Sequence, residues 1–238
     1  MRWPMATCWC LPISMTEATS RGGIVFVMPA LNEAATIAAV VNSVLPFGQA
    51  IVVDDGSTDR TGAIARAAGA TVLRHGHRMG YDAGISDGLR HAADAGFDWA
   101  VTLDADGQHA QDNLPRVVQS LAADVDLVVG IRPSRARWSE RVMAWFFERR
   151  WGIRDPLCGL KAYRLGRYRD RHMQGGTYDS IGTEIMLQYL RSGARVTQIP
   201  IAVLPRADAP RFGNRLSANA RIFAALVLSF LKSRSPVP

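Results

Sequence analysis

The segment WAVTLDADGQH occupies residues 99–109 and places an apolar run directly before two carboxylates. Trp99–Leu103 is predicted to form a buried strand, and Asp104 and Asp106 follow where that strand ends. Two carboxylates this close together cannot both be buried without a counter-charge. Because Mg²⁺ and Mn²⁺ prefer oxygen ligands, and Gln108 could add an amide oxygen, the pattern indicates a divalent metal site that could also hold a diphosphate. The alternative is an Asx-turn with two solvated aspartates.

Apolar strands and helices alternate on both sides of this segment. Four further short runs indicate buried strands, and segments with apolar residues at helical spacing separate them. The predicted strands are Ile24–Met28, Ala50–Val53, Thr71–Leu73 and Leu127–Ile131, and the predicted helices are Asn32–Leu45, Asp59–Ala68, Asp82–Ala95 and Asn113–Leu121. This alternation predicts an α/β domain with a mainly parallel sheet. In such sheets, ligands bind outside the carboxyl ends of the strands.

Two more polar clusters follow predicted strands. In Asp54-Asp55-Gly56-Ser57, a carboxylate could accept hydrogen bonds from a nucleobase or a ribose hydroxyl, and Gly56 permits a positive φ. In Pro29–Glu33, Glu33 could bind a ribose hydroxyl. Each cluster by itself could be an ordinary turn before a helix. Three acidic clusters at one edge of a sheet are harder to explain as structure alone, so we expect a ligand site at that edge.

Charge is distributed unevenly along the chain. Residues 1–131 hold 8 Lys and Arg against 14 Asp and Glu, whereas residues 132–238 hold 20 against 7. The first part could hold a cation, and the second is suited to phosphates, an anionic membrane surface or nucleic acid. Since no RNA-recognition motif accompanies the basic residues, nucleic acid is not expected as a partner. The second part also contains a basic, aromatic helical segment within Arg132–Trp151, a helix at Ser180–Leu190 and a strand at Val196–Val203.

The two ends of the chain are expected to lie outside the α/β domain. Residues 1–22 make a poor signal peptide, because their apolar run is short and contains Pro12, and we predict a disordered extension there. No apolar run reaches the ~18–20 residues of a membrane-spanning helix. Residues 217–238 are predicted to form a C-terminal helix, in which Ile222–Leu231 either packs on the core or lies on a membrane surface.

The cysteines and histidines show no ligand pattern. Cys8, Cys10 and Cys158 form neither a disulfide framework nor a zinc motif, which favours a reducing cytoplasm. His75 and His77 alternate in a predicted loop without a Cys or Glu partner, and we interpret both as surface groups.

Seven motifs in the order found here resemble glycosyltransferase family 2, and the polyprenyl-phosphate sugar transferases within it most of all. The motifs are VMPALNEA, IVVDDGSTD, RMGYDAGISDGLRHA, LDADGQH, VVGIR, RDPLCGLKAYR and TEIMLQYLRSGARVTQIPI. The resemblance covers about residues 23–216. It implies a single-domain GT-A fold, which is a Rossmann-like α/β fold with a mainly parallel mixed sheet flanked by helices.

The resemblance also implies roles for individual residues. Metal would be held by Asp106 and Gln108, and Arg211 and Arg215 in a basic glycine loop would bind the acceptor phosphate. Asp155 could orient an acceptor or pair with the neighbouring Arg154 or Lys161. The implied nucleotide-sugar-binding residues are Pro29, Leu31, Glu33, Val53, Asp55, Asp104, Ala105, Asp106 and Arg132, and the implied catalytic residues are Asp104, Asp106, Arg132 and Asp155.

The implied reaction is an inverting, metal-dependent sugar transfer from a UDP- or GDP-sugar to a polyprenyl phosphate. Such an enzyme would need Mg²⁺ or Mn²⁺ and would be cytoplasmic, where it could also attach peripherally to the inner face of the cytoplasmic membrane. A phosphate acceptor is already anionic, whereas a sugar hydroxyl would require a base, for which Asp155 is the candidate. The alternatives are a family 2 enzyme that acts on a soluble or glycan hydroxyl, and a non-catalytic homologue that binds nucleotide or lipid.

Overall fold

Strand β1 (Ile24–Ala30) is buried on both of its faces. Its side chains alternate, so that Val25 and Val27 belong to one apolar cluster and Phe26 and Met28 to another. A strand with this pattern must lie inside a sheet that is covered on both sides. The computed structural model, which describes residues 23–107, 112–134, 138–170 and 181–203, places β1 in the interior of such a sheet.

In the described part of the chain the sheet has seven strands in the order β3-β2-β1-β4-β6-β5-β7. The pairs β3–β2, β2–β1, β1–β4 and β5–β7 are parallel, and β6 is antiparallel to both β4 and β5. The other strands are β2 (Gln49–Asp54), β3 (Thr71–Arg74), β4 (Trp99–Thr102), β5 (Leu127–Ile131), β6 (Lys161–Arg164) and β7 (Val196–Pro200). The mainly parallel mixed sheet predicted from the sequence is therefore confirmed.

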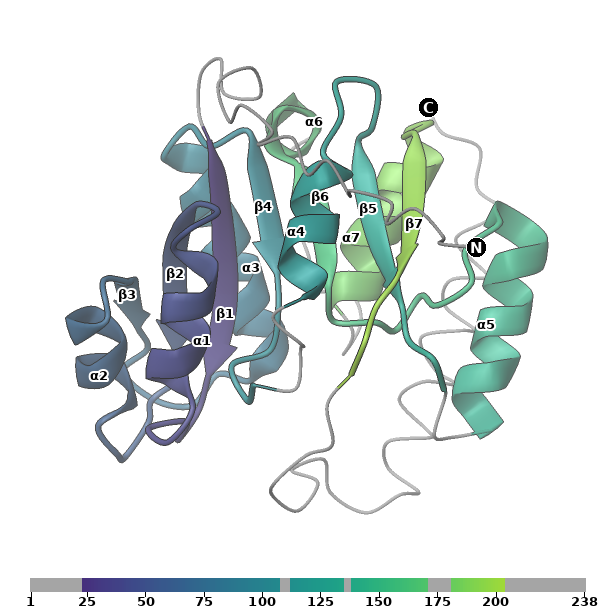
Figure 1. Cartoon of the computed structure of the whole chain (residues 1–238). Coiled ribbons are helices and arrows are strands. Elements are labelled where there is room, and N and C mark those ends of the chain that lie inside the picture. The colour runs from purple at the N-terminus through teal and green to yellow at the C-terminus, as the bar shows by residue number, and fades with distance from the viewer. Residues whose placement is uncertain (1–22, 108–111, 135–137, 171–180, 204–238) are drawn as a thin grey trace, which may run out of the picture.

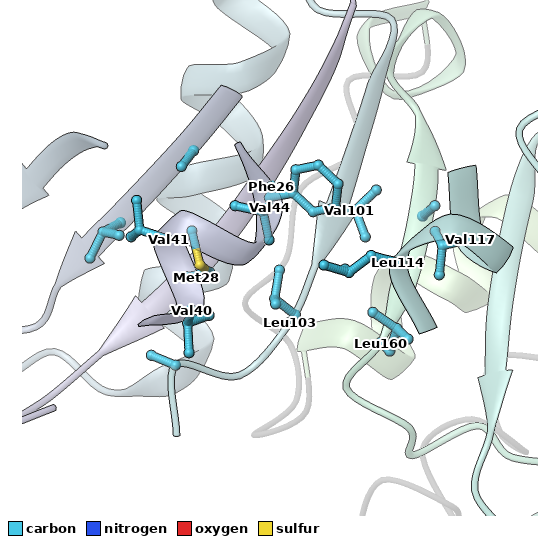
Figure 2. Packing of buried hydrophobic residues seen from close by; sticks show 14 of the residues in the cluster. Phe26, Met28, Val40, Val41, Val44, Val101, Leu103, Leu114, Val117 and Leu160 are labelled. Atoms are coloured by element: carbon cyan, nitrogen blue, oxygen red, sulfur yellow. The ribbon is translucent and has the colours of Figure 1, made fainter. Parts of the chain in front are cut away.

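Helices cover the two faces of the sheet, giving three layers (Figure 1). Figure 2 shows the cluster on one face, where Met28 packs near Val40 and Val41, and Leu114 lies near Val101. This face carries α1 (Ile37–Val44), α2 (Thr61–Ala67) and α4 (Asn113–Gln119), and the other carries α3 (Tyr81–Asp94), α5 (Trp138–Trp151), α6 (Leu165–Asp170) and α7 (Ile181–Arg191). None of the helices in the described ranges is long and apolar enough to cross a bilayer.

The first helix begins five residues later than predicted, at Ile37 instead of Asn32. Asn32 has a φ of 55°, which is outside the helical region. The backbone N–H groups of Asn32 and Glu33 donate instead to Ser57 Oγ at 3.0 Å and Thr61 Oγ1 at 2.8 Å. Long-range bonds to the segment after β2 thus fix the chain after β1 in a non-helical loop, and a turn at residues 34–36 leads into α1.

Strand β6 and helix α6 were not predicted from the sequence. Strand β6 has the sequence KAYR, which lacks the apolar alternation of an ordinary strand, yet Lys161, Ala162 and Tyr163 are all buried. Because the strand begins with a buried lysine, its sequence does not show the apolar pattern from which buried strands are predicted. The predicted N-terminal extension and C-terminal helix lie outside the described residues.

Helix α3 approaches the sheet closely at Gly88. A Cβ added there would overlap Val27 Cγ1 and lie 3.2 Å from Val53 Cγ2, and both valines are fully buried. We expect Gly88→Ala to lower the free energy of unfolding by about 1–3 kcal/mol, measured by urea denaturation, because the core must shift to admit the methyl group. The matched control is Gly166→Ala in α6, where an added Cβ meets nothing within 4 Å. A destabilisation by Gly166→Ala equal to that of Gly88→Ala would contradict the packing argument.

Candidate functional site

The polar clusters meet where the direction of the strand order reverses. Strand β1 lies between β2 and β4, and the helices that follow β1 and precede β4 cover opposite faces of the sheet. In open α/β sheets this arrangement leaves a crevice at the carboxyl ends of the two strands. Leu31 and Glu33 follow β1 there, and Asp104–Asp106 follow β4. The Thr36 hydroxyl, just before α1, donates to the Ala105 carbonyl at 2.9 Å and ties the two loops together.

Asp104 lies at the meeting point of three segments. The hydroxyl of Tyr81, the first residue of α3, donates to Asp104 Oδ1 at 3.0 Å. On the other side, a Cβ added to Gly159 would lie 3.1 Å from Asp104 Oδ2, so the carboxylate packs directly against the glycine backbone. The glycine of RDPLCGLKAYR therefore leaves space for the first aspartate of LDADGQH, and the structure brings these two sequence motifs together.

Pro29 and Val53 form the buried floor beside this crevice. They are opposite each other in the β1–β2 register, and both are buried. A Cβ added to Gly84 in α3 would lie 2.9 Å from Pro29 Cβ, so the helix covers the pair. Ala105 is also buried, whereas Leu31 is half-buried at the edge. The assignment of these residues to nucleotide binding remains a prediction.

Asp54, the last residue of β2, and Asp55, which follows it, are both buried and accept hydrogen bonds from other parts of the chain. Asp54 pairs with Arg74 at 2.8 Å and accepts the Ser57 N–H at 2.9 Å. Asp55 accepts the N–H groups of Met79 at 2.7 Å and Gly80 at 2.8 Å, and it faces His75. Asp55 therefore fixes the loop after β3, whatever contact it makes with a nucleotide. Gly56 has the predicted positive φ, at 73°.

His75 bridges two carboxylates, so the interpretation of this residue as a surface group was wrong. Its Nδ1 is 2.8 Å from Asp55 and its Nε2 is 3.0 Å from Asp87, and its side chain is 9% exposed. Both ring nitrogens can donate only when the imidazole is protonated. Burial by itself would lower the pKa of His75, but the hydrogen bonds and charges of Asp55 and Asp87 outweigh burial and raise it. His77, by contrast, is exposed as expected.

Arg132 and Asp155 form a paired unit at the end of β5. The Arg132 Nε and Nη2 groups donate to the two Asp155 carboxylate oxygens at 2.8 and 2.9 Å, and the Arg132 backbone N–H adds a third bond at 3.1 Å. Arg132 Nη2 also lies 3.4 Å from Glu140 in the first turn of α5. Asp155 thus pairs with Arg132, which lies far away in the sequence.

This pairing determines the protonation of both groups. Burial would raise the pKa of Asp155, but the hydrogen bonds and charge of Arg132 outweigh it and hold that pKa below its ordinary value. Burial would likewise lower the pKa of Arg132, and Asp155 raises it instead. Arg132 Nη1 makes no hydrogen bond to any residue that the structure describes, and the side chain is 26% exposed. The pair is therefore permanently ionised near neutral pH and leaves one guanidinium nitrogen for a ligand.

Beneath this pair, Cys158 and Lys161 are buried. The Lys161 ammonium donates to the Cys158 carbonyl oxygen, and burial lowers the pKa of Lys161. Burial raises the pKa of the Cys158 thiol to about 11, so it stays protonated at neutral pH and is unsuited to act as a nucleophile. Both side chains support the loop that carries Asp155.

Asp106 follows β4 and is partly exposed, so a ligand could reach it. No group of three His, Cys, Asp or Glu residues close enough to hold a metal ion occurs among the described residues. Mg²⁺ and Mn²⁺ commonly take one or two carboxylates from the protein and the rest from substrate phosphates and water, so the oxygen ligands here fit such an ion. Gln108, Arg211 and Arg215, which were also predicted to bind metal or phosphate, lie outside the described residues.

Comparison with known structures identifies the class of protein. The chain superposes on glucosyl-3-phosphoglycerate synthase from Mycobacterium tuberculosis, solved with Mn²⁺, UDP-glucose and phosphoglyceric acid, with a TM-score of 0.68 and 25% identity over 88% of this chain and 79% of that one. With the seven-stranded mixed sheet of the described residues, this similarity shows a glycosyltransferase with the GT-A fold.

The sequence comparisons identify the family. The family model described as glycosyl transferase family 2 matches residues 25–182. This chain therefore belongs to glycosyltransferase family 2. It is similar to an undecaprenyl-phosphate mannosyltransferase of Micrococcus luteus, at 26% identity over 77% of this chain and 84% of the relative. It is also similar to an uncharacterised glycosyltransferase of Mycobacterium tuberculosis, at 28% identity over 88% and 96%. The resemblance seen in the sequence is confirmed.

The His75 bridge makes the stability of the fold depend on pH. Because its pKa is raised, the imidazolium stabilises the fold fully below the unfolded value of about 6.5, and this contribution is lost as the pH rises through the folded value. We expect His75→Gln to lower the free energy of unfolding by about 1–2 kcal/mol near pH 6 and by less at higher pH. Urea titrations at several pH values measure this, with exposed His77→Gln as the control. A difference that stays constant with pH would contradict the charged bridge.

Proposed function

We propose that this enzyme transfers a sugar, with inversion, from a UDP- or GDP-sugar to a polyprenyl phosphate. The observation that carries this proposal is the state of Asp155, which is 1% exposed and bound on both oxygens by Arg132. A carboxylate with a lowered pKa and three donors is a poor proton acceptor. A hydroxyl acceptor would need a base, whereas a phosphate acceptor is already an anion at neutral pH and needs little help. Asp155 then serves to position Arg132.

In this proposal Arg132 binds the anionic groups of the reaction. Asp155 and Glu140 accept from its Nε and Nη2 groups, and Nη1 is the guanidinium nitrogen that no described residue engages. The acceptor phosphate would meet this nitrogen and attack the anomeric carbon from the face opposite the leaving nucleotide. Placement and charge would supply most of the rate enhancement, because the nucleophile needs no activation.

The donor would bind along the carboxyl ends of β1, β2 and β4. Glu33 and Asp55 would contact the nucleotide, and Asp104, whose carboxylate accepts a hydrogen bond from Tyr81, would orient the sugar. Asp106, with Gln108, would hold the Mg²⁺ or Mn²⁺. When bound, such a cation neutralises charge on the donor diphosphate. The Mn²⁺ and UDP-glucose in the solved synthase support this arrangement.

Two kinds of acceptor have support among the similar proteins. The undecaprenyl-phosphate mannosyltransferase supports a lipid phosphate. The synthase was solved with phosphoglyceric acid, which favours a soluble acceptor as the second candidate. The ion pair of Asp155 favours the lipid phosphate, and attachment to the inner face of the cytoplasmic membrane would follow from it.

The metal assignment can be tested at Asp106. We expect Asp106→Ala to lower sugar transfer by about 100-fold or more, because the donor diphosphate loses its bound cation. Chelation of the metal with EDTA should have a similar effect on the unaltered enzyme. Exposed Asp124→Ala is the control, and circular dichroism checks that each variant is folded. Full activity of Asp106→Ala would show that the metal is held elsewhere.

The acceptor can be identified by partition of label into organic solvent. We expect purified protein with Mg²⁺ or Mn²⁺, undecaprenyl phosphate and one of radiolabelled UDP-glucose, UDP-GlcNAc or GDP-mannose to yield labelled lipid. That product should disappear in Asp106→Ala. Metal-dependent nucleotide binding by calorimetry without any labelled lipid would instead favour a soluble or hydroxyl acceptor.

A further inference from the structure

Helix α5 has apolar side chains on two opposite faces. Its inward face packs Met143, Ala144 and Phe147 into the core, where each is at most 2% exposed. A surface helix normally has charged and polar residues on the other side. Here the other side carries Trp138, Val142 and Trp145, spaced four and three residues apart so that they lie together on one helical face.

The two tryptophans are the most exposed large apolar side chains in the described part of the chain, at 61% for Trp138 and 58% for Trp145. Val142 between them is 37% exposed. Exposed apolar residues that are scattered singly need no explanation, whereas a cluster on one element marks an interaction surface. We call these three residues, with Arg141 and Arg149 beside them, the α5 outer face.

The charges beside the tryptophans indicate what kind of partner this face fits. Arg141, Arg149 and Arg150 are exposed on α5, and Glu148 is the one exposed acidic residue of this helix. The Arg149 guanidinium lies 5.2 Å from the centre of the Trp145 ring. Tryptophan and arginine side by side are favoured at the headgroup level of a bilayer, where the ring is partly immersed and the cation meets lipid phosphates.

The α5 outer face also lies next to the site. Glu140, in the first turn of α5, faces inward and contacts Arg132 Nη2. The helix that carries the tryptophans therefore begins beside the arginine that would bind the acceptor phosphate. The outer face could rest on a lipid surface while Arg132 meets a phosphate group at the same surface.

We propose that the α5 outer face docks this enzyme on an anionic lipid bilayer and thereby brings Arg132 to the lipid phosphate. The docking is independent of the reaction, whereas the delivery of Arg132 rests on the proposed function. The binding energy would come from burying the two indole rings in the interface and from the attraction of Arg141 and Arg149 to anionic headgroups.

Vesicle sedimentation with the full chain tests the docking. We expect binding to vesicles of phosphatidylglycerol and phosphatidylcholine, weak binding to phosphatidylcholine alone, and loss of binding at about 0.5 M salt. The double substitution Trp138→Ala with Trp145→Ala should weaken binding by about tenfold or more, and Arg141→Glu with Arg149→Glu should weaken it similarly. Both pairs are exposed, so the fold should be unchanged by circular dichroism.

The matched control is Leu45→Ala, another exposed apolar residue, which follows α1 on a different part of the molecule (Figure 1). It should bind vesicles as the unaltered chain does. Unchanged binding by the double tryptophan variant would overturn the proposal, since the lipid contact would then lie elsewhere, for example in residues 222–231. A dimer in light scattering that the double variant dissociates, without vesicle binding, would also overturn it, because a second copy would then cover the face.

A transfer assay separates docking from the reaction. With undecaprenyl phosphate in detergent micelles, the double tryptophan variant should be as active as the unaltered enzyme, whereas in anionic vesicles it should lose most activity. Equal loss in both formats would contradict a role in docking. Absence of labelled lipid for every form of the enzyme would refute the proposed acceptor, while the sedimentation result would still decide whether the α5 outer face binds lipid.

Discussion

The site depends on one electrostatic constraint, which is that carboxylates buried at the carboxyl edge of the sheet need donors from the same chain. Asp54 and Asp55 use Arg74, His75 and backbone N–H groups, and Asp155 uses Arg132. Apart from the Ser57 N–H, which lies in the same turn as Asp54, each donor belongs to a different strand end or loop from the carboxylate it satisfies. Satisfying these charges therefore also fixes the loops around the crevice, and a ligand meets a surface that is already held in place.

The ion pair of Asp155 and Arg132 has a chemical consequence as well as a structural one. A carboxylate whose pKa an arginine holds below its ordinary value is a poor base for a hydroxyl acceptor at neutral pH. In the proposed function, Arg132 would therefore serve as an anion-binding group where a hydroxyl acceptor would need a base. Arg132, together with the tryptophans and arginines of α5, would suit a ligand that has both an acidic headgroup and an apolar tail.

Most of the sheet and the place of the site could be predicted from sequence, because they depend on local patterns. Apolar runs and the acidic clusters after them located β1, β2, β4 and β5 and the edge where Asp55 and Asp104 lie. The parts that could not be predicted depend on contacts between residues distant in sequence. His75 between Asp55 and Asp87, Arg132 on Asp155, and buried Lys161 in β6 all place charge where local pattern indicates surface. The late start of α1 has the same origin, since Ser57 and Thr61 take its first N–H groups.

The reversed direction of β6 shortens the path of the chain to the crevice. An antiparallel strand begins at the edge where its neighbour ends, so residues 155–159 reach Asp104 directly as they enter β6. A parallel strand in the same position would begin at the far edge, and the chain would need a crossover of about a dozen residues or more to return. Strand β6 then ends at the edge of the sheet that is remote from the crevice, and α6 begins at that same edge. Homologues that differ in length after Arg164 would therefore change the far edge first, and the spacing between Asp104, Gly159 and Asp155 would be preserved.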